Sequence, residues 1–268
     1  MDEIKKYYNN YGMKEWDRLI KDPFHRLEFD TTLYYLGRHL PKKGLILDAG
    51  GGPGRYSIVL AKKGYRLVLL DYSPKLLEIA KSKIKKENIE NRFEKIIEGS
   101  VIDISLFKDN TFDAVLCLGG VISHLVKNSD RNKAIKELKR VAKKNAPIFV
   151  SIIGRLAVLK KAPVLFPEEI PVKYFPLLRD KGNYYGGYGF TKMHGFLLED
   201  FKNLIIKNDL KPIKFVGLEG LSSSIGNYVN RLLKHRKQWK VWIETHYKTC
   251  ELPSVVDTSE HILCICKK

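Results

Sequence analysis

Residues 45–74 constrain this chain more than any other segment, and they read LILDAGGGPGRYSIVLAKKGYRLVLLDYSP. Two apolar runs, which end in Asp48 and Asp71, flank a glycine turn and a helix-like stretch. The order predicts strand, turn, helix and strand, so in a parallel sheet both acids lie at the carboxyl edge, where open α/β folds bind ligands. The glycines of the turn allow a close backbone approach to a ligand, because they adopt positive φ at no steric cost.

Two common phosphate-binding patterns do not fit this turn. The dinucleotide fingerprint G-x-G-x-x-G needs a third glycine at the position of Arg55, whose long side chain blocks close packing of helix on strand. No Gly-Lys-Ser/Thr closes the turn as in a P-loop. Asp48 would also place negative charge beside phosphates, so the turn suits a ligand that carries an ammonium or sulfonium group.

The sequence DAGGGPG of residues 48–54 resembles the first motif, D/E-x-G-x-G-x-G, of the class I S-adenosylmethionine-dependent methyltransferases. Asp71 matches the acid that this family places on the ribose hydroxyls. Residues 98–101 (EGSV) correspond to its adenine-contacting loop, and residues 110–118 (NTFDAVLCL) to its fourth strand. The resemblance covers residues 41–153 well and the C-terminal part loosely.

The resemblance implies an α/β fold and a cofactor, S-adenosyl-L-methionine, without a metal. The expected fold is a Rossmann-like seven-stranded sheet, mostly parallel with an antiparallel last strand, with helices on both faces, N-terminal helices and inserted cap segments. Cofactor contacts are expected from Tyr11, Asp48, Gly50, Gly52, Asp71, Tyr72, Ser100, Val101 and Leu118. One departure is Ser100, where the family usually has an Asp; its hydroxyl accepts hydrogen bonds more weakly, and Asp103 is an alternative acceptor.

Four segments are expected along the chain. They are an N-terminal helical cap (1–40), a cofactor-binding core (41–153), a lid insertion (154–196), and the C-terminal part of the sheet (197–268) with a helical insertion (221–254). The lid is expected to be rich in loops, because it holds four prolines and the run GNYYGGYGF at 182–190. Strands are expected at 45–47, 66–70, 92–98, 112–118, 147–153, 214–219 and 261–266, and helices within 2–40 and at 55–63, 74–86, 130–144, 197–206 and 228–247.

The chain is strongly basic, with a net charge of +18 and a pI of about 9.6 over 268 residues. Lys and Arg gather at 81–86, 131–144 and 231–240. One interpretation is a nucleic-acid footprint, in which phosphate neutralisation supplies affinity. We favour solvated helix faces, because the clusters fall on segments with helical periodicity and the chain lacks the Asn-Pro-Pro-aromatic and Pro-Cys motifs of base-directed methyltransferases.

Other classes of protein fit less well. No apolar run of about 18 residues is present, as a membrane-spanning helix would need. The first residues, MDEIKKYYNNYG, have no apolar region typical of a secretory signal. Cys117, Cys250, Cys264 and Cys266 lack zinc-like spacing, so core thiols in a reducing, cytoplasmic setting are expected.

Methyl transfer is an in-line displacement, for which positioning alone supplies roughly 7–11 kcal/mol. A neutral oxygen or nitrogen nucleophile gains further from a base near pH 7, and histidine is the natural candidate. His124, after the fourth strand, and His194, at the end of the lid, are the candidate catalytic residues. The remaining helical histidines, His25, His39, His235 and His246, are expected to face solvent.

The sequence thus predicts a methyltransferase that acts at oxygen or nitrogen of a small-molecule acceptor. An acidic acceptor is compatible with the positive field of the chain. An RNA methyltransferase and a non-catalytic relative that only binds S-adenosylmethionine remain as alternatives. Neither the identity of the acceptor nor the oligomeric state follows from the sequence.

Overall fold

The computed structural model describes residues 2–187 and 190–268, so Tyr188 and Gly189 of the aromatic lid run lie outside the described residues. Its centre is a seven-stranded sheet in the order β3-β2-β1-β4-β5-β9-β8. The strands are β1 (Leu45–Ala49), β2 (Arg66–Asp71), β3 (Phe93–Glu98), β4 (Ala114–Cys117), β5 (Pro147–Ile153), β8 (Lys211–Gly217) and β9 (His261–Lys267).

The predicted sheet architecture is confirmed. Strands β1 to β5 pair in parallel, while β9 runs antiparallel between β5 and β8. The central strands β1, β4 and β5 are almost wholly buried, as continuous apolar runs require when both faces of a sheet are covered. The parallel strands therefore end at one edge, and β9 begins at that edge.

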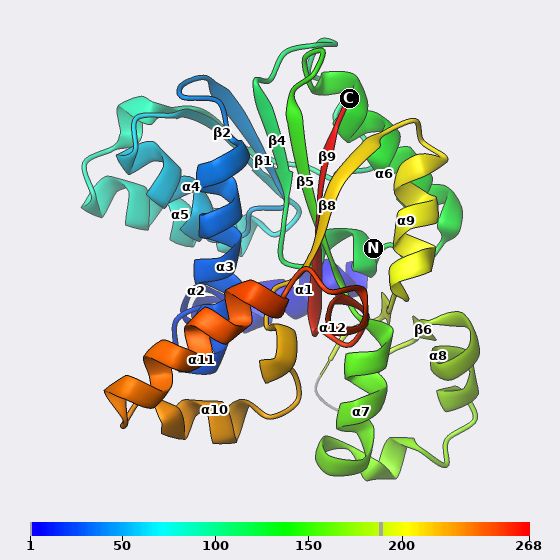
Figure 1. Cartoon of the computed structure of the whole chain (residues 1–268). Helices are drawn as coiled ribbons and strands as arrows, with labels where there is room; N and C mark the ends of the chain where they lie inside the picture. The colour runs from blue at the N-terminus through cyan, green and yellow to red at the C-terminus, as the bar shows by residue number, and fades with distance from the viewer. Residues whose placement is uncertain (1, 188–189) are drawn as a thin grey trace.

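Helices cover both faces of the sheet (Figure 1). One face carries α3 (Pro23–His39), α4 (Arg55–Lys62) and α5 (Pro74–Lys86), and the other carries α6 (Asn128–Val141) and α9 (Leu198–Ile206). The predicted start of α5 is confirmed, because the Ser73 side chain caps it by accepting a hydrogen bond from the Leu76 N–H, and Pro74 follows at the first helical position.

Further helices gather beyond the carboxyl edge of the sheet, at the lower end in Figure 1. From the N-terminus come α1 (Asp2–Tyr11) and α2 (Met13–Arg18). From the two insertions come α7 (Arg155–Leu165), α8 (Phe175–Lys181), α10 (Gly226–Leu232), α11 (Arg236–Thr249) and α12 (Pro253–Asp257). Four short 3-10 helices lie in the connections between elements, namely η1 (Glu90–Arg92), η2 (Val121–His124), η3 (Pro167–Glu169) and η4 (Gly220–Ser222).

The lid differs from the loop-rich segment that its prolines predict. It holds α7, η3, α8 and a small hairpin of β6 (Asn183–Tyr184) and β7 (Met193–His194). Pro163 lies inside α7, whereas Pro167 and Pro176 occupy first turns of helices, where the missing N–H has no intrahelical partner to lose. Within the described residues no helix is both long and apolar enough to cross a bilayer.

Gly154, which directly follows β5, packs closely against the backbone of Ser259. A Cβ on Gly154 would lie 2.1 Å from the Ser259 carbonyl oxygen, whereas Gly37 in α3 has no heavy atom within 4 Å of such a Cβ. We expect Gly154→Ala to destabilise the fold by about 1–3 kcal/mol through this clash. Gly37→Ala, the matched control, should stabilise it by about 0.5–1 kcal/mol through helix propensity. Urea denaturation measures both, and equal shifts of the midpoint would contradict the expectation.

Candidate functional site

A cavity opens at the carboxyl ends of β1, β2 and β4, and it gathers the residues predicted to bind the cofactor. Its lining includes the predicted Asp48, Gly50, Gly52, Asp71, Tyr72, Ser100, Val101 and Leu118, together with His124. We call it the first cavity. The predicted contact of Tyr11 is the exception, because Tyr11 lines a neighbouring cavity, while Ile4 and Tyr8 of the same helix line the first.

The glycine turn is held by the two acids that precede and follow it. Oδ2 of Asp71 accepts a hydrogen bond from the Gly52 N–H at 2.7 Å, and Oδ1 accepts from the Ser73 N–H at 2.8 Å. A Cβ on Gly51 would lie 2.5 Å from the Asp48 carboxyl, and one on Gly50 2.4 Å from Val121. The turn therefore tolerates no side chain at these two positions, and its backbone borders the cavity directly.

Asp48 is buried and only half satisfied. The Ser57 hydroxyl donates to its Oδ2 at 2.6 Å, while Oδ1 has no hydrogen-bond partner among the described residues. Burial raises the pKa of Asp48 to about 6 against the opposing effect of the Ser57 hydrogen bond, and burial likewise raises the pKa of Asp71 to about 6. An orphaned buried carboxylate oxygen is costly, and a cationic or hydrogen-bond-donating ligand would offset that cost. The donor set thus fits S-adenosylmethionine, which carries positive charge and ribose hydroxyls.

The long side chain that breaks the dinucleotide fingerprint turns toward the N-terminal helices. The guanidinium of Arg55 lies 3.8 Å from the centre of the Trp16 ring, and its Nε donates to the Trp16 carbonyl at 2.7 Å. Trp16 thereby joins α2 to α4 and lies outside the cavity lining. Ser100 lines the cavity, and its hydroxyl accepts from the Ile102 N–H at 3.3 Å. Asp103 is exposed and lies outside the lining.

A second cavity of about 390 Å³ adjoins the first. Aromatic side chains from the N-terminal helices and the lid dominate its wall, namely Tyr7, Tyr8, Tyr11, Phe24, Phe166, Tyr184 and Phe190. Four residues line both cavities, namely Tyr8, Glu15, Arg18 and Gly119, and we call these four the junction. The volume of the cavity and the aromatic rings in its wall are typical of a small-molecule site.

His124 is hydrogen-bonded to Tyr8, one of the four junction residues. Its Nδ1 lies 3.2 Å from the Lys192 carbonyl oxygen, which can only accept, so this nitrogen carries the proton. Nε2 then accepts from the Tyr8 hydroxyl at 2.7 Å. Burial lowers the pKa of His124 to about 4, so the imidazole is neutral at physiological pH.

His194 lies away from both cavities. It is buried in β7, where Nδ1 is 2.7 Å from Oδ1 of Asn183 and the ring packs edge-on against Phe196. Burial, with Arg131 and Arg155 nearby, lowers its pKa to about 3. The structure therefore brings His124, and not His194, to the candidate site.

The expectation that the helical histidines face solvent is wrong for His246. It is buried, with Nε2 2.8 Å from the Thr31 hydroxyl, because α11 packs that face against α3. His235 is exposed, and His25 and His39 are half-buried. The four cysteines are free and buried, as expected for core thiols.

Sequence reasoning missed Arg18 and the acids around it. Nε of Arg18 donates to Glu15 at 3.0 Å and Nη1 donates to Glu28 at 2.6 Å, which places partly buried ion pairs at the junction. Glu28 could have been singled out from the sequence, because it lies on the buried face of α3 among Phe24, Leu27 and Thr31. A charged residue at an apolar position of the helical period marks a polar cluster under that helix.

Two comparisons with known proteins concern sequence. The family described as "Methyltransferase domain" matches residues 47–150, which hold the glycine turn and both acids. A glycine/sarcosine N-methyltransferase of Parasynechococcus marenigrum is 32% identical over 148 residues, covering 54% of this chain and 50% of that protein. A ubiquinone/menaquinone biosynthesis C-methyltransferase of Zymomonas mobilis is 32% identical over 134 residues, covering 49% and 48%. The chain thus spans about half the length of these relatives.

Comparison of folds extends beyond the matched region. A SAM-dependent methyltransferase from Methanosarcina mazei superposes with a TM-score of 0.61 at 17% identity, covering 87% of this chain and 96% of that one. At this identity the likeness concerns the fold alone.

The raised pKa of Asp48 gives a prediction about stability. Because the folded-state value lies above the unfolded one, the ionised group costs stability progressively from about pH 4, and the full cost is present above about pH 6. We expect Asp48→Asn to stabilise the ligand-free protein by about 1–3 kcal/mol at pH 8 and to weaken S-adenosylmethionine binding at least tenfold.

Thermal unfolding at pH 4 and pH 8 tests the first part, because the stabilisation should fade at the lower pH. Calorimetry tests the second part. A variant that is destabilised at pH 8 would show that Asp48 contributes to the fold instead of opposing it.

Proposed function

Because the chain belongs to the class I S-adenosylmethionine-dependent methyltransferases, we propose that it methylates an oxygen or nitrogen of a small molecule held in the second cavity. The observation that carries this proposal is the junction, where the first cavity meets the aromatic cavity at Tyr8, Glu15, Arg18 and Gly119. An in-line displacement needs donor and acceptor on opposite sides of one carbon, and two adjoining cavities meet that need.

The cofactor belongs in the first cavity, where S-adenosylmethionine supplies a methyl group bonded to a positively charged sulfur. Asp71 offers its carboxylate to the ribose hydroxyls, and the free Oδ1 of Asp48 offers negative charge to a cationic group. Val101, Leu118 and Tyr72 contribute apolar and aromatic surface to the same cavity. The residues of this chain thus bind the donor and exclude water from it.

Tyr8 and His124 are the residues that handle the proton of the acceptor. Since the Tyr8 hydroxyl donates to Nε2 of His124, the lone pairs of its oxygen remain for an O–H or N–H group at the junction. Tyr8 can pass its own proton to His124 as it takes one from the acceptor. His124 is neutral and oriented by the Lys192 carbonyl, so its Nε2 can take that proton in transit, but its pKa of about 4 makes it a weak base from which the proton passes on.

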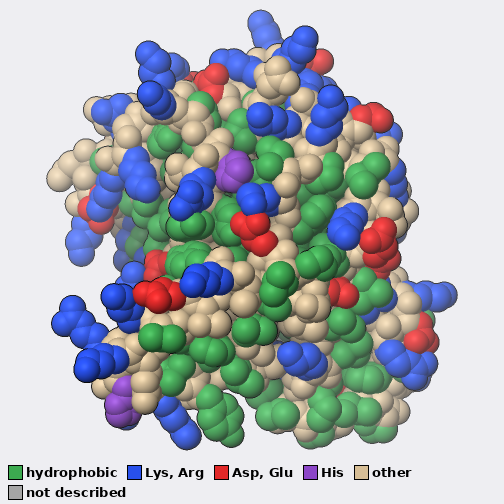
Figure 2. Space-filling view, in the orientation of Figure 1, with side chains coloured by type: hydrophobic (Ala, Val, Ile, Leu, Met, Phe, Trp, Pro, Cys, Tyr) green, Lys and Arg blue, Asp and Glu red, His purple; other side chains and the backbone are tan. Residues whose placement is uncertain are grey.

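A small acceptor fits better than RNA. Five carboxylates line the second cavity, from Glu15, Glu28, Glu169, Glu219 and Glu260, and they offset the cationic Arg18, Lys21, Lys161 and His261 there, so the cavity lacks the excess of positive charge that a phosphate backbone needs. Figure 2 shows Lys and Arg scattered around the visible face, with acidic side chains between them, and no single basic stripe. The N-methyltransferase relative is consistent with a nitrogen acceptor, whereas the C-methyltransferase relative shows that carbon chemistry also occurs among similar proteins.

The cofactor assignment is tested by calorimetry on wild-type protein and on Asp71→Ala. Wild type should bind S-adenosylmethionine and not NADH, and Asp71→Ala should weaken binding at least tenfold, because it removes the ribose-facing carboxylate and the anchor of Gly52. Asp103→Ala, an exposed acid outside the cavity, is the control and should bind as wild type. Tight binding of NADH alone would overturn the assignment.

The role of Tyr8 is tested by Tyr8→Phe, with Tyr11→Phe as the matched control on the same helix. Release of S-adenosylhomocysteine, measured over a panel of small amines, phenols and carboxylic acids, identifies a working acceptor. With that acceptor, Tyr8→Phe should lower kcat about 10- to 100-fold and leave the Kd for S-adenosylmethionine unchanged. Equal activity of the two variants would remove Tyr8 from the proton path. No release with any acceptor would favour a protein that only binds the cofactor.

A further inference from the structure

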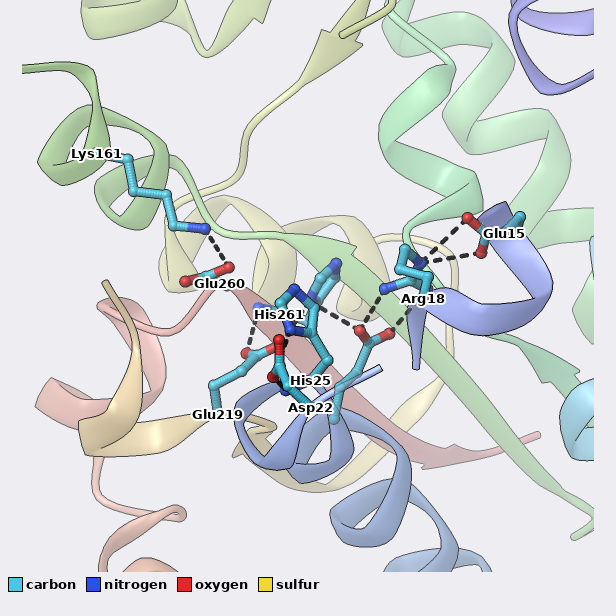
Figure 3. A network of polar contacts seen from close by, with 9 residues as sticks. Glu15, Arg18, Asp22, His25, Lys161, Glu219, Glu260 and His261 are labelled. Atoms are coloured by element: carbon cyan, nitrogen blue, oxygen red, sulfur yellow. Dashed lines mark hydrogen bonds and ion pairs between the residues drawn. The ribbon is translucent and has the colours of Figure 1, made fainter. Parts of the chain in front are cut away.

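A half-buried histidine is held by a glutamate at the wall of the second cavity (Figure 3). His261 is the first residue of β9, and Glu219 follows β8. The carboxylate of Glu219 accepts from the backbone N–H of His261 at 2.8 Å and lies 2.7 Å from its ring Nδ1. Because one carboxylate binds both the backbone and the ring, it fixes the orientation of the imidazole.

The other ring nitrogen, Nε2, has no hydrogen-bond partner among the described residues. The His261 side chain lines the second cavity with 17% of its surface exposed. Glu28, held by Arg18, lies 3.5 Å from Nδ1 on a second side. Both carboxylates therefore lie beside Nδ1 of the ring, and Nε2 is left to bind a molecule in the cavity.

The carboxylates that line this cavity already have partners within the described part of the chain. Arg18 binds Glu15 and Glu28, and His261 binds Glu219. Lys161 pairs with Glu260, and the Tyr184 hydroxyl donates to Glu169 at 2.9 Å. Nε2 of His261 is a polar group still available beside these paired carboxylates, and it is a donor whenever the ring carries its second proton. A complementary ligand must then present an accepting oxygen.

Electrostatics keeps that proton in place. Burial alone would lower the pKa of His261, but the carboxylates of Glu28 and Glu219 outweigh burial and raise it to about 9. Arg18 opposes this shift weakly. The imidazolium is thus the normal state at pH 7, so both ring nitrogens donate and the histidine cannot act as the base.

We propose that the Nε2–H of His261, oriented by Glu219, is a specificity determinant that binds a carbonyl or carboxylate oxygen of the methyl acceptor. This inference rests on the proposed function, since it assigns the occupant of the second cavity. His261 lies outside the junction and outside the first cavity, so the oxygen that it binds belongs to a part of the acceptor remote from the methylated atom. Glu219 is the positioning residue.

Two substitutions separate this role from a structural one. In His261→Gln the amide nitrogen reaches the place of Nε2, so the cavity keeps a donor while the ring contact with Glu219 is lost. In His261→Asn the shorter side chain keeps a donor near Nδ1 for Glu219 and leaves the cavity without one. If Nε2 binds the acceptor, His261→Gln should keep more affinity for it than His261→Asn. If His261 only pairs with Glu219 to stabilise the fold, His261→Asn should keep more affinity than His261→Gln.

The measurement uses the full chain saturated with S-adenosylhomocysteine and three probes, benzoate, benzamide and benzylamine. Benzoate or benzamide should shift the 15N resonance of His261 Nε2 in labelled wild-type protein, and benzylamine should not. A response to benzoate alone identifies a carboxylate, and a response to both identifies a carbonyl oxygen. His261→Asn should weaken the responding probe about tenfold or more, and His261→Gln by less.

Two results would overturn the inference. One is a His261 resonance that neither oxygen-bearing probe shifts. The other is a reversed order of the two variants. Failure of wild-type protein to bind S-adenosylhomocysteine would count against the proposed function itself, so the two failures are distinguishable.

Discussion

The close approach of two buried carboxylates to a glycine backbone is the constraint on which the site depends. Asp71 binds the Gly52 N–H, and Asp48 lies so near Gly51 that a Cβ there would meet its carboxyl at 2.5 Å. Asp71 is the last residue of β2 and Asp48 the penultimate residue of β1, and the two strands pair directly, so the sheet itself fixes the distance between the acids. The turn therefore depends on tertiary packing as well as on glycine, because Gly50, Gly52 and Gly54 have positive φ, and its backbone forms one wall of the first cavity.

Burial of these acids opposes stability and favours binding. The pKa of Asp48 and of Asp71 is raised to about 6, so both are ionised at neutral pH at a cost to the folded state. A ligand with positive charge and hydroxyl donors relieves that cost. At the wall of the second cavity the balance is the opposite, because the carboxylates of Glu28 and Glu219 favour the charged form of His261 and outweigh its burial. The first cavity thus holds charged acids, and the second holds a charged histidine, with which a bound ligand can pair.

The local parts of this design were predictable from sequence. The alternation of strand, glycine turn and helix in residues 45–74, and the Ser73–Pro74 helix start, depend on neighbours in the chain. The helices of the lid were not predictable from sequence, because a proline in the first turn of a helix cannot be told from a proline in a loop by sequence alone. The pairing of Arg18 with Glu28, and of Glu28 with His261, joins the N-terminal helices to the last strand, and no local pattern encodes a contact across such a separation.

Helix α1 links the two halves of the site. Its Ile4 and Tyr8 line the first cavity, while Tyr7, Tyr8 and Tyr11 line the second. Its exposed ion pair between Glu3 and Lys192 contributes little stability. The hydrogen bonds of Tyr8 with His124 and of Asn9 with Ser73 contribute more, because they are partly buried and join α1 to the loops after β4 and β2. Since one helix forms part of both walls, the contacts that orient α1 shape both cavities together.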